Sequence, residues 1–133
     1  ATTEYVVVDG HIPVVPNTLN APYPCTRSGF VKVSALIAAR PGTDYDEFFE
    51  YWLGPHAGNV ADALDRAGGI RYVISLSEQP ADERYAGMAE LYFPDRDALG
   101  RYRQLFERDD MDRWVDSEAG ETFLSTTEMV GIP

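Results

Sequence analysis

The hydrophobic pattern changes period twice within residues 30–76, which read FVKVSALIAARPGTDYDEFFEYWLGPHAGNVADALDRAGGIRYVISL. Every second residue of 31–37 is apolar, which is typical of a strand that packs one face against a core. Apolar residues then recur three and four positions apart from about Tyr45 to Ala67, which predicts an amphipathic helix. Residues 70–76 return to a strand pattern. The stretch thus predicts strand, helix and strand, with one face of the first strand formed by Val31, Val33, Ala35 and Ile37.

The predicted helix carries clear start and stop signals. Thr43 or Asp44 is placed to cap its first turn, and Gly68-Gly69 ends it. Gly54-Pro55 interrupts it, because a proline has no N–H to donate to the carbonyl four residues earlier. We therefore expect a kink there, or a short helix followed by a longer one. The apolar stripe of this helix consists of Phe48, Phe49, Trp52, Leu53, His56, Val60 and Leu64.

The rest of the chain adds two strands and a second helix. Residues 85–93 predict a strand, and Pro94-Asp95 opens a helix that extends to about Phe106. A short acidic helix around Trp114 and a last strand over 122–130 follow. The order β-α-β-β-α-β is that of the ferredoxin-like α+β fold, with one antiparallel sheet.

Several strands carry large apolar residues on both faces, for example Val73 against Tyr72 and Ile74. The helices of this fold cover only one face of the sheet, so the second face needs another cover. A second copy of the chain is the simplest cover, and we therefore expect a homodimer.

Length and charge narrow the function. The 133 residues fit one domain, and a net charge of −11 disfavours nucleic acid and anionic membrane surfaces as partners. Cys25 is the single cysteine, which excludes an internal disulfide and a zinc site with several cysteines. No apolar run approaches the ~20 residues that span a bilayer, and the start lacks a secretory signal pattern. The expected compartment is the cytoplasm.

Residues 1–29 form a proline-rich extension, which we interpret as an arm that precedes a domain of residues 30–133. The apolar run 5–8 either adds an edge strand or wraps a neighbouring subunit. Residues 11–24 are expected to be extended, and we expect the arm to lie against a dimer partner or over a pocket mouth. The prolines of this segment are Pro13, Pro16, Pro22 and Pro24.

Three segments resemble the EthD-like family of dimeric α+β barrels, also called ABM-like or stress-responsive barrels. They are Arg40-Pro41-Gly42 with Tyr51-Trp52 and His56, then 88–95, then 122–130. The resemblance covers about residues 31–131. It implies two sheets packed face to face across a dimer, and a pocket between the sheet and helices of each subunit. Relatives include polyketide cyclases, lactone isomerases, cofactor-free monooxygenases and accessory proteins of ether breakdown, so the fold alone leaves function open.

Three residues are candidates for acid–base catalysis. His56 lies on the apolar stripe, where a neutral imidazole is able to accept a proton; the alternative is a core histidine bonded to a carbonyl. Glu90 is a carboxylate in the middle of a strand and a candidate acid, or else a structural ion-pair partner of Arg71 or Lys32. Tyr72 is a candidate donor to a carbonyl or enolate oxygen, or else a core aromatic.

Further residues are candidates for substrate binding. Aromatic walls suit a flat apolar ring, although aromatics at helical spacing are also ordinary core residues. Asn59, one turn beyond His56, is placed to orient a substrate oxygen. The acidic run 107–121, with seven acids, is interpreted as a solvated face. The aromatic candidates are Trp52, Phe48, Phe49, Tyr92 and Trp114.

We expect neither a metal nor a cofactor. His11 and His56 are the only histidines, and no HxH or HxxxH spacing occurs. The leading hypothesis is a cofactor-free enzyme that moves protons next to a carbonyl of a hydrophobic cyclic or polyketide-like substrate, by cyclisation, isomerisation, dehydration or lactone opening. The alternatives are a cofactor-free monooxygenase, a non-enzymatic binding or accessory protein of an oxidative or biosynthetic pathway, and a scaffold without a cavity.

Overall fold

The computed structural model describes residues 1–10, 25–27, 30–125 and 129–131. The extended segment expected over 11–24 lies outside these residues. The strands are β1 (Thr2–Asp9), β2 (Cys25–Arg27), β3 (Val31–Ile37), β4 (Arg71–Ser77), β5 (Gly87–Phe93), β6 (Glu121–Ser125) and β7 (Met129–Gly131). The helices are α1 (Tyr45–Tyr51), a π-helical turn (Trp52–His56), α2 (Ala57–Ala67), α3 (Arg96–Leu105), and the 3-10 turns Pro80–Asp82 and Asp110–Arg113.

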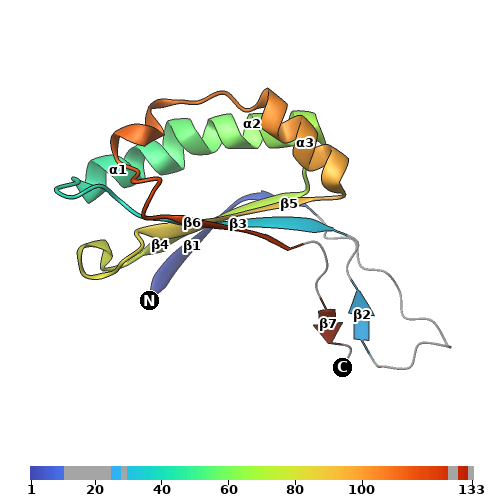
Figure 1. Ribbon diagram of the computed structural model, residues 1–133, viewed down its shortest axis with the longest axis horizontal. Helices are drawn as coiled ribbons and strands as arrows, with labels where there is room; N and C mark the ends of the chain where they lie inside the picture. Colours follow the sequence, from blue (N-terminus) through green and yellow to red (C-terminus); the bar gives the residue numbers. More distant parts are fainter. Residues whose placement is uncertain (11–24, 28–29, 126–128, 132–133) are drawn as a thin grey trace.

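Five strands form one antiparallel sheet in the order β1-β4-β5-β3-β6. All three α-helices lie on the same face of this sheet, and no helix of the described residues covers the opposite face (Figure 1). We call the two sides the helix-covered face and the helix-free face. The ferredoxin-like α+β prediction is confirmed. None of the described helices has the length and apolar character needed to span a membrane.

The two ends of the chain differ from the simplest expectation. The apolar run 5–8 belongs to β1, which adds an edge strand beside β4, one of the two placements left open by the sequence. The predicted continuous last strand over 122–130 is wrong, because β7 pairs with β2 in a separate two-stranded ladder. Ser125 at the end of β6 pairs with Lys32, the second residue of β3, so a longer β6 would find almost no further residue of β3 to pair with.

The long helical segment forms as its signals predict. The Asp44 carboxylate accepts hydrogen bonds from the N–H groups of Asp46 and Glu47 at 3.1 and 3.2 Å, and Gly68 ends α2 with a φ of 83°. At Gly54-Pro55 the helix widens, and the Ala57 N–H reaches back five residues to the Trp52 carbonyl. This π-helical turn accommodates the proline without ending the helix, and it places His56 at the start of α2.

The core lies between the helices and the helix-covered face. Phe48 stacks between Trp52 and Trp114, with ring centroids 5.4 and 5.9 Å away. A Cβ at Gly87 of β5 would lie 2.5 Å from the Ser75 carbonyl oxygen and 2.9 Å from the Trp52 ring. Glycine at that position therefore lets the indole lie directly on the strand. The largest fully buried side chains are Trp52, Tyr72, Phe48, Phe93, Leu64 and Ile74.

The helix-free face combines apolar residues with ion pairs between neighbouring strands. Lys32 and Glu90 face each other there, with Nζ and Oε2 2.7 Å apart. Phe123 of β6 lies opposite Ser34 of β3 on this face and is 52% exposed. The expected homodimer would cover this surface.

Candidate functional site

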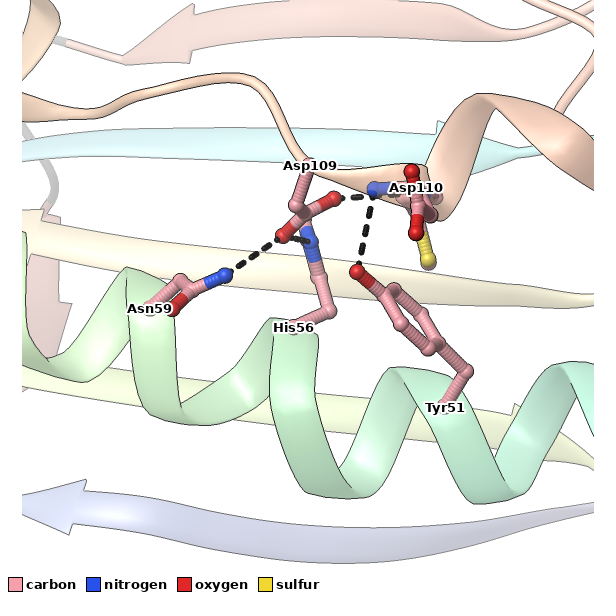
Figure 2. A network of polar contacts seen from close by, with 6 residues as sticks. Tyr51, His56, Asn59, Asp109 and Asp110 are labelled. Carbon is pink, nitrogen blue, oxygen red and sulfur yellow. Dashed lines mark hydrogen bonds and ion pairs between the residues drawn. The ribbon is translucent and has the colours of Figure 1, made fainter.

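His56 is held by a carboxylate from a distant part of the chain. Its Nδ1 lies 2.7 Å from Oδ2 of Asp109, in the segment that follows α3 (Figure 2). The two side chains are only 17% and 10% exposed. This contact spans 53 residues of sequence. The predicted alternative of a histidine bonded to a backbone carbonyl is therefore not what the structure shows at Nδ1.

Asp109 is in turn fixed by two further hydrogen bonds. Asn59 Nδ2 donates to Oδ2 at 3.1 Å, and the Met111 N–H donates to Oδ1 at 3.0 Å. Burial alone would raise the pKa of Asp109, but the hydrogen bonds from Asn59, Met111 and His56 outweigh it and lower the pKa. Asp109 is thus an ionised carboxylate with a fixed orientation.

The segment around Asp109 is also tied to α1. The Asp110 N–H donates to the hydroxyl oxygen of Tyr51 at 3.0 Å (Figure 2). Tyr51, His56 and Asn59 thus contact the same short segment from three successive turns of one helix. The π-helical turn lies between the first and second of these contacts, so its widened geometry sets how the segment docks.

The carboxylate decides the form of the imidazole. An ionised Asp109 only accepts hydrogen bonds, so it selects the tautomer in which Nδ1 carries the proton. Nε2 then keeps its lone pair, and no described residue hydrogen-bonds to it. A histidine oriented by a carboxylate, with its other nitrogen available, is an arrangement suited to a general base.

A cavity of about 170 Å³ opens beside this pair on the helix-covered side of the sheet. Its walls are mostly apolar, and the Phe106 ring meets the imidazole edge-on at a centroid distance of 5.9 Å. An apolar cavity of ~150 Å³ accommodates benzene, so this one has room for a small ring system that extends toward solvent. Its lining is formed by Ile37, Trp52, His56, Ala89, Phe106, Arg108, Asp109, Met111, Asp112 and Val115.

Of the aromatic candidates on the helix-covered side, one lines the cavity and the others pack behind it. Trp52 lines the cavity, as expected. Phe48, Phe49 and Trp114 do not line it; they pack against Trp52 or against one another. Asn59 lies outside the lining as well, and it orients Asp109 rather than a ligand.

The structure does not bring Glu90 or Tyr92 to His56. Both side chains lie on the helix-free face, because Ala89 and Leu91 alternate with them toward the core. Of the readings left open for Glu90, the structure shows the ion pair with Lys32, at 2.7 Å. Burial lowers the pKa of Lys32, but the hydrogen bond and charge of Glu90 outweigh this and raise it.

Tyr72 lies on the helix-covered face of β4 but does not line the cavity. Its hydroxyl is buried without a hydrogen-bond partner among the described residues. Burial raises the pKa of Tyr72, and the nearby Tyr102 and Asp109 add to this effect against a small opposing contribution of Trp52. Tyr72 therefore stays neutral at physiological pH.

Asp109 is the functional residue that the sequence analysis missed. The interpretation of 107–121 as a solvated face fails at this residue, whose side chain is almost completely buried. The available signal was local: an aspartate two residues before Met111 is placed to cap the short turn that follows. No group of three or more His, Cys, Asp or Glu side chains within the described ranges is arranged to hold a metal ion.

Comparison with protein families matches the EthD domain to residues 40–124, which run from the loop between β3 and α1 into β6. This stretch contains His56, Asp109 and the whole lining of the cavity except Ile37. No curated protein and no solved structure matches the chain.

Proposed function

This chain belongs to the EthD domain family of the dimeric α+β barrel superfamily, and on that premise we propose that it is a cofactor-free enzyme in which His56 is the general base. The observation that carries the proposal is the 2.7 Å contact between Nδ1 of His56 and Asp109, beside an apolar cavity that both residues line. The substrate is a small hydrophobic molecule with a ring and an enolisable carbonyl group.

The chemistry is proton transfer next to that carbonyl. Nε2 of His56 takes a proton from the carbon beside the carbonyl. The C–H electron pair forms a C=C bond, and the π pair of the C=O bond moves onto the oxygen, which gives an enolate. Asp109 stabilises the imidazolium that forms, as a positioning residue that does not touch substrate. Return of the proton to another atom of the same molecule completes an isomerisation, and the same enolate leads to cyclisation, dehydration or lactone opening.

The apolar walls support this role. The cavity lined by Trp52, Phe106 and Met111 limits the contact of the imidazole with bulk water, and the His56 side chain is 17% exposed. We further propose that a second copy covers the helix-free face, which leaves the cavity of each subunit on the outside of the paired sheets.

A second candidate is a binding protein without turnover. It is favoured by one observation: neither Glu90 nor Tyr72, the two predicted proton donors, lines the cavity. The two candidates make opposite predictions for proton exchange catalysed by the intact protein.

Exchange of the α-protons of 2-tetralone in D₂O, followed by proton NMR, tests the proposal. We expect the protein to accelerate exchange, His56→Ala to reduce the acceleration by about 100-fold or more, and Asp109→Asn by about 10- to 100-fold. Asp62→Asn removes the same charge from an exposed position on α2 and is the matched control. Glu90→Gln should behave like that control, within about twofold.

Equal exchange by the wild-type protein and His56→Ala, with both folded, would overturn the assignment of His56. Tight binding of 2-tetralone with no acceleration would favour the binding protein.

A further inference from the structure

The ionisable residues that line the cavity differ in solvent exposure. His56 and Asp109 are its buried pair, whereas Arg108 and Asp112 have side chains that are 84% and 46% exposed. All four line the same cavity. Arg108 and Asp112 therefore stand at its mouth, between a bound ligand and solvent.

Arg108 and Asp112 form an ion pair with each other. One terminal nitrogen of Arg108 donates to Oδ2 of Asp112. Asp112 is the fixed partner, because its backbone carbonyl accepts a hydrogen bond from Nε of Arg40 at 2.9 Å. Arg108 has further N–H donors with no partner among the described residues.

On the premise of the proposed function, we propose that Arg108 is the specificity residue of the cavity and binds an anionic oxygen of the ligand, either a carboxylate or the enolate oxygen formed by His56. Asp112 holds the guanidinium at the mouth until the ligand oxygen replaces it. An exposed ion pair contributes little free energy, so this exchange costs little. The planar guanidinium matches a carboxylate with two parallel hydrogen bonds.

Charge favours an anionic over a cationic ligand group. Proton removal by His56 leaves negative charge on the ligand, and Arg108 is the one permanently cationic side chain among the described residues that line the cavity. A cationic ligand would have to displace Arg108 and would gain nothing from its unused donors. The protein as a whole, at a net charge of −11, repels anions, so binding of an anion here reports on Arg108 and not on a general attraction.

Three probes that share a naphthalene ring test the proposal by calorimetry on the intact chain. They are 2-naphthoate, 2-naphthamide and 2-(aminomethyl)naphthalene. We expect the wild-type protein to bind the carboxylate about tenfold or more tightly than the amide. Arg108→Gln should reduce the affinity to that of the amide and leave amide binding unchanged within about twofold. Asp112→Asn should strengthen carboxylate binding, because it removes the competing anion.

Arg103→Gln, a change of equal charge at an exposed position of α3, should leave all three affinities unchanged. Equal binding of the carboxylate by wild type and Arg108→Gln would overturn the proposal, as would preferred binding of the amine or no binding of the carboxylate. This binding test does not depend on catalysis. If His56→Ala still accelerates tetralone exchange as wild type does, while Arg108→Gln loses the preference for the carboxylate over the amide, only the proposed function fails.

Discussion

Each side of the sheet carries a basic and an acidic side chain in close contact, and the two contacts have the same length. Lys32 Nζ lies 2.7 Å from Glu90 on the helix-free face, and His56 Nδ1 lies 2.7 Å from Asp109 on the helix-covered side. Both pairs are largely buried. Distance and burial therefore do not separate a structural pair from a candidate catalytic one.

The two pairs differ in whether the basic group keeps a lone pair that is able to accept a proton. Lys32 points its ammonium at Glu90 and lies over the Tyr92 ring, 5.3 Å from its centroid, and Glu90 raises its pKa. A lysine in this state stays charged and has no lone pair to accept a proton. His56 uses one nitrogen for Asp109 and keeps the other, beside a cavity that both residues line. The spare nitrogen and access to a cavity are the informative features.

The largest expected effect comes from the core of the helix-covered side. Phe48→Ala should lower the free energy of unfolding by about 3–5 kcal/mol, because the ring is 0% exposed and stacks on Trp52 and Trp114. Urea unfolding at two protein concentrations measures it. Phe123→Ala is the matched substitution on the helix-free face and should act through association, with a dimer dissociation constant at least about tenfold higher.

Analytical ultracentrifugation separates the two faces. A Phe123→Ala protein that associates as tightly as wild type would contradict a dimer through this part of the helix-free face. A loss below about 1 kcal/mol for Phe48→Ala would contradict the described core.

A smaller effect is expected in acid. The pKa of Asp109 is lower in the folded protein than its ordinary value of 3.8, so the unfolded chain takes up this proton more readily. The stability that Asp109 contributes is complete above pH 3.8 and is lost as the pH falls through the lowered pKa. The free energy of unfolding of Asp109→Asn should therefore fall less steeply than that of wild type below about pH 4.

Asp62→Asn is the control, because this exposed carboxylate has only a long surface contact with Arg66. Denaturant titrations between pH 3 and pH 6 compare the three proteins. If the free energy of unfolding falls equally steeply with pH in wild type and Asp109→Asn below about pH 4, the hydrogen-bonded state of Asp109 is contradicted.

Most of the fold was predictable because the spacing of apolar residues differs between strands and helices. The apolar alternation of β3 and the stripe on α1 and α2 depend only on local sequence, and so do the cap at Asp44 and the stop at Gly68. The form of the interruption at Pro55 was not predictable, because a proline inside a helix is compatible with a kink and also with a widened turn. The end of β6 depends on the length of β3, which is a tertiary property.

Only part of the candidate site was predictable from the sequence. His56 and Trp52 belong to one helix, and their spacing places them on one face. Asp109 reaches His56 across 53 residues, and it stands in the acidic run 107–121, where the sequence alone does not tell a buried carboxylate from exposed ones. Glu90 was ambiguous because both faces of β5 carry apolar side chains, so alternation alone did not tell which face meets the helices.

The most direct test is the tautomer of His56. Long-range ¹H–¹⁵N correlation spectra at a pH where the ring is neutral distinguish Nδ1–H from Nε2–H, and the His56→Gln protein identifies the signal against that of His11. The account predicts that the wild-type ring carries its proton on Nδ1, facing Asp109, and that Asp109→Asn abolishes this preference. A wild-type ring protonated mainly on Nε2 would contradict it, because the nitrogen that does not face Asp109 would then have no lone pair for a substrate proton.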